Sequence, residues 1–149
     1  MIQREEPTEV RDEYFSVFYR NLINGSFEFP DIFSKISQAR NAGIPNIIFA
    51  CYHALDNSGR FNILELYDPT AWESAKKDYP VGDDYLGFYN ISGNKRITFP
   101  KEVLEKLSLG NVNQIALRGH GAVIEIWKAE DYARFDQECQ EHFENHHFI

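Results

Sequence analysis

An internal repeat constrains the fold of this chain more than any other feature of its sequence. Gly25-Ser26-Phe27-Glu28-Phe29-Pro30 matches Lys95-Arg96-Ile97-Thr98-Phe99-Pro100 at an offset of 70 residues. Glu65-Leu66-Tyr67 matches Glu125-Ile126-Trp127 at an offset of 60. Such self-similarity predicts that one supersecondary unit occurs twice. The two offsets imply that the first copy carries about ten extra residues in its middle.

Both copies predict the same succession of elements. Phe27 alternates with Phe29, as Ile97 does with Phe99, which is typical of a short strand with one buried face. The proline that follows ends the strand and opens a helix, where its missing N–H costs nothing. A hairpin comes next, and its predicted strands are 47–52 with 61–67 in the first copy and 114–117 with 123–127 in the second.

An aromatic-bearing helix closes each predicted copy. In the first copy Asp68 is the expected N-cap, with Pro69 at the first helical position and Trp72 one turn later. In the second copy the helix starts near Ala129 and carries Tyr132. Because the aromatic residues recur at equivalent positions, we interpret them as packing residues rather than a platform for ligand stacking.

We divide the chain into an acidic N-terminal tail (1–13), a first repeat (14–78), a linker (79–85), a second repeat (86–136) and an acidic C-terminal tail (137–149). The net charge is -8. Residues 1–13 carry two cations against five acids, and residues 130–149 carry one cation against six acids. The middle of the chain is therefore neutral, so that a basic face there is compatible with the overall acidity.

Several classes of protein fit this sequence poorly. No apolar stretch approaches the ~18 residues of a membrane helix, and the polar start at Met1 does not resemble a signal peptide. We therefore expect a cytoplasmic protein without a membrane partner. Cys51 and Cys139 form no Cys-x-x-Cys pair. With no phosphate loop, nucleophile elbow or paired carboxylates, we expect no enzyme activity, no cofactor and no small-molecule substrate.

The repeated unit resembles the SpoVT–AbrB swapped-hairpin element, and its tandem arrangement resembles the MraZ family. The residues that carry the resemblance are Lys95 to Leu104, Gly119 to Trp127 and Tyr132 in the second copy, and Phe27 to Pro30, Leu64 to Tyr67, Pro69 and Trp72 in the first. The resemblance covers roughly residues 15–135. It implies an α+β fold in which two tandem AbrB-like swapped-hairpin repeats form one module, double-ψ or swapped-hairpin and β-barrel-like, with peripheral helices.

The resemblance also implies a function. MraZ-like proteins assemble into rings and bind repeated promoter sites near genes for cell division and wall synthesis, as nucleoid-associated transcriptional regulators. Their DNA contact is a loop of the form Asp-x-Lys-Gly-Arg directly before the strand, with the arginine as the main reader. Here Ser92-Gly93-Asn94-Lys95-Arg96 keeps the arginine, whereas Leu22-Ile23-Asn24-Gly25-Ser26 has lost it. The expected double-stranded DNA contacts are Asn94, Lys95 and Arg96, with Asn24 and the nearby Arg20.

Two other segments have alternative interpretations. Asp56-Asn57-Ser58-Gly59-Arg60 fits the family loop in its letters, but no proline follows at the required spacing. We interpret it as a hairpin turn, with a displaced contact loop as the alternative. His142 and His146 have helical i, i+4 spacing, which could bind a metal. Because no Glu stands at the position of a His-Glu-x-x-His motif, we interpret these histidines as exposed and expect no metal.

Two hypotheses follow. In the first, the chain is an MraZ-like regulator that binds promoter DNA as a ring-like homo-oligomer. In the second, it is an oligomeric interaction protein or an AbrB-type antitoxin that kept the fold and lost most DNA binding. The serine at position 26 and the acidic ends favour the second hypothesis, and Arg96 favours the first.

Overall fold

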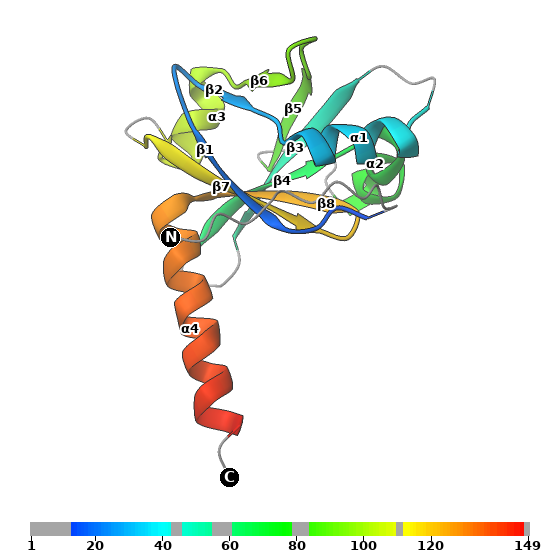
Figure 1. The fold of residues 1–149 in the computed structure, drawn as a ribbon. Coiled ribbons are helices and arrows are strands. Elements are labelled where there is room, and N and C mark those ends of the chain that lie inside the picture. Colours follow the sequence, from blue (N-terminus) through cyan, green and yellow to red (C-terminus); the bar gives the residue numbers. More distant parts are fainter. Residues whose placement is uncertain (1–12, 43–45, 55–60, 79–83, 110–111, 148–149) are drawn as a thin grey trace.

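A six-stranded sheet, a two-stranded ribbon and surrounding helices make this an α+β protein (Figure 1). The computed structural model describes residues 13–42, 46–54, 61–78, 84–109 and 112–147, with side chains up to residue 141. The segment 55–60, interpreted above as a hairpin turn, lies outside these residues. The strands on either side of it pair with each other, and Ala54 is opposite Asn62.

The same order of elements occurs in both halves of the described chain. The first half contains β1 (Val17–Asn21), β2 (Ser26–Glu28), α1 (Asp31–Arg40), β3 (Ile47–Ala54), β4 (Asn62–Tyr67) and α2 (Pro69–Ala75), followed by the 3-10 turn η1 (Lys76–Asp78). The second half contains β5 (Tyr85–Asn90), β6 (Arg96–Thr98), α3 (Lys101–Lys106), β7 (Gln114–His120), β8 (Val123–Lys128) and α4 (Ala129–His147).

The two halves exchange their first strands. The order in the large sheet is β1-β7-β8-β4-β3-β5, so the β-hairpin of each half carries the first strand of the other half on its outer side. Strand β1 of the first half pairs with β7 of the second, and β5 of the second half pairs with β3 of the first. At the centre, β4 pairs antiparallel with β8, and Glu65 is opposite Glu125, the two glutamates matched by the 60-residue offset.

The sheet is open among the described residues, with β1 and β5 at its edges. The expectation of a barrel-like closure is therefore wrong. The α+β class itself is confirmed, because the described helices lie around a mostly antiparallel sheet.

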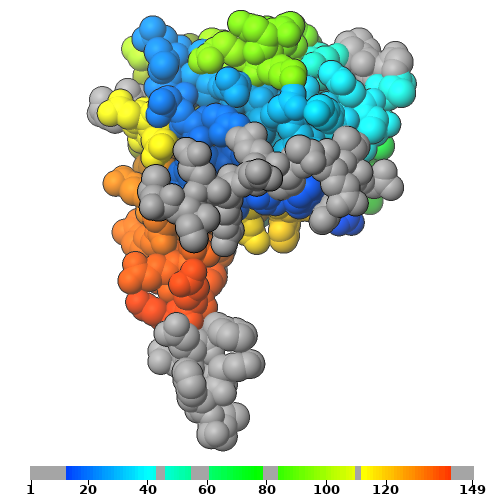
Figure 2. Space-filling view, viewed as in Figure 1, coloured from blue at the N-terminus to red at the C-terminus, as the bar shows by residue number. Residues whose placement is uncertain are grey.

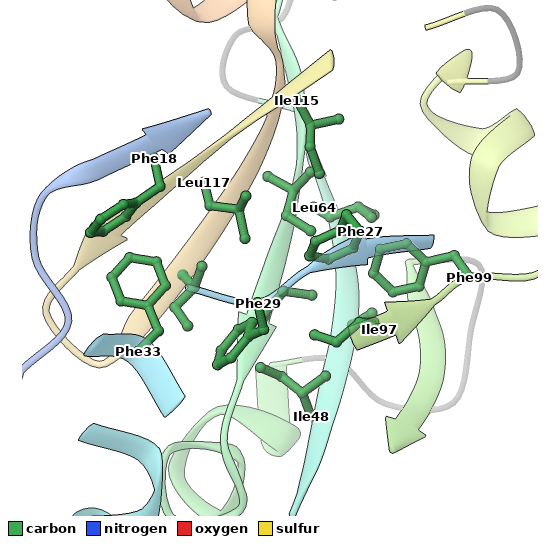
Figure 3. Packing of buried hydrophobic residues seen from close by; sticks show 14 of the residues in the cluster. Phe18, Phe27, Phe29, Phe33, Ile48, Leu64, Ile97, Phe99, Ile115 and Leu117 are labelled. Carbon is green, nitrogen blue, oxygen red and sulfur yellow. The ribbon is translucent and has the colours of Figure 1, made fainter. Parts of the chain in front are cut away.

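The main core fills the space between one face of the sheet and the ribbon with α1. Phe27 from the ribbon and Phe33 from α1 are fully buried, and they cluster with Ile48 and Leu64 from the sheet (Figure 3). Phe18 and Phe29 meet Phe33 at ring-centroid distances of 5.1 and 5.9 Å. Burial of this many large side chains at about 25 cal/mol per Å2 of apolar surface supplies most of the driving force for folding.

Helices α2 and α4 pack against the other face of the sheet. Trp127 is fully buried and packs against the partly buried Phe135 of α4. Trp72 of α2 stacks on Phe49 with ring centroids 4.9 Å apart. The aromatic residues interpreted as packing residues therefore do pack here. Cys51 lies in the same layer, where burial, with Glu65 and Asp84 nearby, raises the pKa of its thiol to about 12. The remainder of α4 projects away from the body (Figure 2).

Several boundaries predicted from the sequence need correction. The edge strands β1 and β5 are absent from the sequence prediction, and Tyr85, assigned to the linker, is the first residue of β5. Gly87, at φ +99°, interrupts the pattern that would have indicated a strand. Strand β7 continues to His120, beyond the predicted end at 117. Helix α4 runs through the proposed boundary between 136 and 137.

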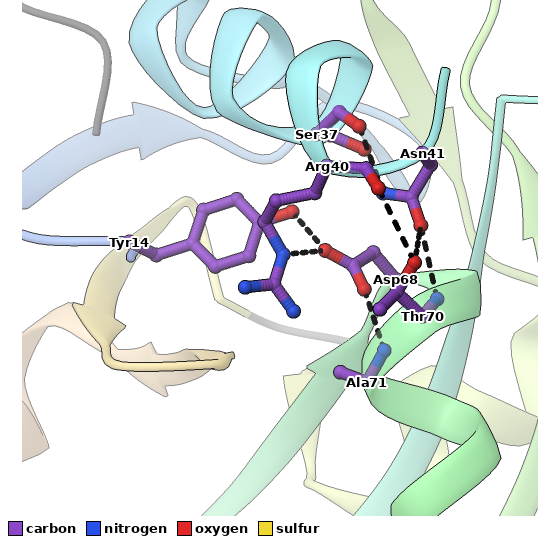
Figure 4. A network of polar contacts seen from close by, with 7 residues as sticks. All are labelled: Tyr14, Ser37, Arg40, Asn41, Asp68, Thr70 and Ala71. Atoms are coloured by element: carbon purple, nitrogen blue, oxygen red, sulfur yellow. Dashed lines mark hydrogen bonds and ion pairs between the residues drawn. The ribbon is translucent and has the colours of Figure 1, made fainter. Parts of the chain in front are cut away.

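A buried polar network joins the start of the described chain to α1 and α2 (Figure 4). Asp68 is the N-cap of α2, as the sequence predicts, and its Oδ1 accepts a hydrogen bond from the Ala71 amide at 2.8 Å. Its Oδ2 accepts from the Tyr14 hydroxyl and from Arg40 Nε, both at 2.6 Å. One carboxylate therefore fixes three segments that are far apart in the sequence.

The charge of Asp68 is stabilised although its side chain is fully buried. Burial alone would raise the pKa of the Asp68 carboxyl, but hydrogen bonds from Arg40, Tyr14 and the Ala71 amide hold it below the ordinary value of 3.8. A folded-state pKa below the unfolded one means that this contribution to stability is present above about pH 4 and is lost as the pH falls through the folded value.

We predict that Asp68→Asn lowers the free energy of unfolding by about 3 kcal/mol at pH 7, because it leaves the Arg40 charge mostly buried without this ion partner. Asparagine is as good an N-cap as aspartate, so the loss reports on charge. Urea unfolding at pH 7 and again below pH 3.8 measures the free energy of unfolding of the variant and of the wild type. The difference between the two proteins should shrink at the lower pH. The exposed Asp78→Asn is the control, and an equal effect of both variants would contradict the prediction.

Candidate nucleic-acid interface

The ribbon of β2 and β6 carries the segment in which the sequence places its DNA contacts. Phe27 and Ile97, matched by the 70-residue offset, are direct partners in this antiparallel pair, and both are fully buried against the core. Side chains alternate along a strand. Ser26 and Glu28 of β2 therefore lie with Arg96 and Thr98 of β6 on the opposite side, which we call the outer ribbon face.

A turn precedes each strand of the ribbon, and the two turns differ. Ile23 and Ser26 exchange both backbone hydrogen bonds at 2.9 Å around Asn24 and Gly25, whose φ angles are 52° and 78°. Asn-Gly with two positive φ angles is the preferred sequence of a two-residue type I′ turn. A Cβ on Gly25 would lie 2.7 Å from the Phe99 carbonyl oxygen, so only glycine fits there.

The second turn is longer and contains Lys95 in a glycine-like conformation. Its bonds run from the Lys95 amide to the Ser92 carbonyl and from the Ser92 amide to the Arg96 carbonyl, both at 2.9 Å. Lys95 has φ +60°, a left-handed conformation that costs a side-chain-bearing residue about 1 kcal/mol. The alignment with the MraZ loop puts its glycine at this same position.

The predicted contacts do not form one cluster. The Phe29 amide donates to the Lys95 carbonyl at 2.7 Å, and the Phe99 amide donates to the Gly25 carbonyl at 2.9 Å. The two turns are therefore at opposite ends of the ribbon, roughly 13 Å apart at 3.3 Å per strand residue. Asn94 and Lys95 lie at one end and Asn24 at the other, with Arg96 between them on the outer face.

Acidic side chains of the same chain pair with two of the predicted cations. Lys95 forms an ion pair with Asp31 at the start of α1, and the hydrogen bonds from Lys95 and then Lys35 lower the pKa of that carboxyl. Arg20 Nε lies 3.9 Å from a carboxylate oxygen of Glu28. The Arg20 side chain is only 18% exposed, lies over the Phe18 ring and donates to the Tyr19 carbonyl. Arg20 is thus less available to DNA than the sequence suggested.

Arg96 is the predicted contact with the most suitable position. Its Nε donates to Ser26 Oγ at 3.0 Å, so the side chain lies across the ribbon onto the first half. Sequence reasoning missed Glu28, which is the direct cross-strand partner of Arg96. The signal was present, since Glu28 alternates with the buried Phe27 and aligns with Thr98 at the 70-residue offset.

A hollow adjoins the turn at Asn24. Its volume is about 440 Å3, and its lining includes Ile23, Asn24 and Leu104. A second hollow of about 480 Å3 shares Val112 and Asn113 with the first and extends to Tyr19. Ile23 and Tyr19, at 59% and 44% exposure, give this side of the molecule an apolar character.

Clusters of metal-binding side chains and membrane-spanning helices are both absent from the described residues. No three His, Cys, Asp or Glu side chains in this part of the chain come close enough together to bind a metal ion. The side chains of His142 and His146 lie outside that part. No helix of the described chain combines the length and the hydropathy required to span a membrane.

Comparison with protein-family models and with curated proteins assigns this chain to no family. No protein-family model matches its sequence, and no curated protein matches it either. The case for a function therefore depends on the fold and on the residues of the outer ribbon face.

We predict that Lys95→Gly is more stable than Lys95→Ala by about 1 kcal/mol, because both variants remove the ion pair with Asp31 but only glycine relieves the left-handed strain. Chemical denaturation of the two variants measures the difference. At Glu102, in the first turn of α3, the order should reverse, because alanine is the better helix former. Equal stability of the two Lys95 variants would contradict the assigned backbone conformation.

Proposed function

We propose that this chain is an MraZ-like transcriptional regulator that binds double-stranded DNA. Its targets would be repeated promoter elements of the type found before division and cell-wall genes, which would place it on the nucleoid. The observation that carries the proposal is Arg96, which sits on the outer face of a ribbon built from equivalent strands of both halves.

The topology supports the family assignment. The two halves have the same order of elements, exchange their first strands and pair their short strands with each other. Two interleaved swapped-hairpin repeats would produce this arrangement. The positive φ of Lys95, where the family loop has glycine, adds a local point of agreement. Both observations concern the fold, and the DNA contact is the further step that we infer.

The outer ribbon face has chemistry suited to a DNA groove. A two-stranded ribbon fits the major groove of B-DNA, where arginine donates two hydrogen bonds to guanine O6 and N7. Lys95 at the end of the ribbon would meet phosphates. A single subunit offers few cations, and the net charge of -8 opposes association. Useful affinity would therefore require several subunits bound to repeated sites.

Exposed apolar residues support self-association. Tyr19 lies on the edge strand β1, and Phe88, which is 59% exposed, lies on the edge strand β5. The two strands occupy corresponding places in the two halves. One hollow lies beside Tyr19, and Phe88 belongs to the opposite edge of the sheet. A contact between different edges of successive copies is heterologous and closes into a ring when the rotation permits.

A second candidate is an oligomeric interaction protein that has lost DNA binding. The ion pairs of Lys95 with Asp31 and of Arg20 with Glu28 favour it, because DNA would have to compete with carboxylates already in place. An AbrB-type antitoxin is one form of this candidate. DNA binding distinguishes the two.

We predict that the protein binds duplex DNA from directly upstream of its own coding sequence, and that Arg96→Gln weakens binding by about 2 kcal/mol per contacting subunit. Fluorescence anisotropy at two salt concentrations measures both the affinity and its salt slope. The slope should fall by about one for each phosphate that a substituted cation no longer neutralises.

Arg134→Gln is the matched control, because Arg134 is an exposed arginine on α4, away from the ribbon, and pairs with Asp131. Unchanged binding by this variant is the expected result. Absent binding, or binding that responds equally to both substitutions, would reject the regulator and favour the interaction protein.

We further predict an assembly of several subunits at micromolar concentration, because association removes the apolar edge residues from water. Native mass spectrometry gives the subunit number, and Phe88→Glu together with Tyr19→Glu should lower it. A monomer under all conditions would contradict the multivalent part of the proposal.

A further inference from the structure

Glu28 occupies an unusual place for a carboxylate on a candidate DNA surface. It is the direct cross-strand partner of Arg96, and its side chain is 60% exposed. The buried neighbours Phe27 and Ile97 direct both side chains to the outer ribbon face. A carboxylate beside phosphates lowers affinity, so its presence calls for a physical role.

Glu28 is one of several groups that hold Arg20 in place. Arg20 NH1 donates to the Tyr19 carbonyl at 3.0 Å, and its guanidinium lies 5.4 Å from the centre of the Phe18 ring. The ion pair with Glu28 is long, at 3.9 Å. The equivalent position in the second half is Thr98, which has no charge.

The chemistry of an ionised carboxylate selects one base edge. A carboxylate only accepts hydrogen bonds. In the major groove cytosine presents its N4 amino donor, whereas guanine presents two acceptors and thymine presents an acceptor and a methyl group. Arginine, a pure donor, selects guanine for the complementary reason. Arg96 therefore matches the major-groove edge of a guanine, and Glu28 matches that of a cytosine.

The spacing on the ribbon agrees with this assignment. Directly opposed residues of an antiparallel pair have Cβ atoms about 5 Å apart. Successive base pairs rise by about 3.4 Å. Side chains of Arg96 and Glu28 can therefore reach the same base pair or neighbouring ones.

From this geometry we propose that Glu28 is a specificity-determining residue that accepts a hydrogen bond from a cytosine N4 amino group next to the guanine contacted by Arg96. The inference rests on the proposed DNA-binding function and adds the base that the carboxylate reads. Glu28 discriminates mainly by repelling wrong bases, at a cost in overall affinity.

Selection from a duplex library with a randomised central segment tests the proposal, using the full-length wild type, Glu28→Gln, Glu28→Ala and the control Glu73→Gln. Glu73 is an exposed glutamate on α2, paired with Lys76, so the control makes the same change in net charge elsewhere. The wild type and the control should enrich the same cytosine, by about tenfold over the other bases.

Glu28→Ala should lose this preference, and Glu28→Gln should lose it or shift it toward adenine, which an amide side chain contacts through N6 and N7. Both should bind unselected duplex more tightly than the wild type. An unchanged cytosine preference in both variants would overturn the role of Glu28 while the regulator stands. Absence of wild-type binding to any duplex at low salt would overturn the proposed function and this inference together.

Discussion

Backbone pairing between the two halves is the constraint on which the rest of this structure depends. Among the described strands, β1 pairs with β7 and β5 pairs with β3, so each edge strand lies on the other half. The ribbon repeats this dependence, because Phe29 bonds to the turn of the second half and Phe99 to the turn of the first. Neither half could complete its sheet or bury its phenylalanines alone. The outer ribbon face, where Arg96 bonds to Ser26, therefore exists only when both halves are folded.

Sequence patterns predict the parts of the fold that depend on local chemistry. The alternation around Phe27 and Ile97, the prolines before α1 and α3 and the Asp68 N-cap each follow from a residue's own conformational or hydrogen-bonding preference. The edge strands escape such patterns, because Gly87 in β5 and the polar C-terminal end of β1 obscure the alternation. The barrel-like closure of the sheet is predicted wrongly for a different reason. Whether the two edges of a sheet meet depends on all of its strands together, and no local pattern records it.

The candidate site is predictable only in part, because its residues come from both halves. Arg96 can be selected from its place before a strand, but its partners cannot, because Ser26 and Glu28 belong to the other half of the chain. The pairing of Lys95 with Asp31 depends likewise on the start of α1 approaching the opposite turn. The same exchange of strands that builds the surface brings carboxylates to its cations. Charge counted along the sequence is thus a poor guide to the potential of this face.

The position of β1 in the sheet has a consequence for synthesis of the protein on the ribosome. Val17 pairs with Arg118, so one of the first strands to be made waits for one of the last. Contacts between residues so far apart in sequence give a high contact order, which slows folding because a long loop must close first. The β3–β4 hairpin can form early, but its edges stay open until the second half is translated. During that interval the nascent chain exposes pairing edges and is the form most open to pairing with another copy.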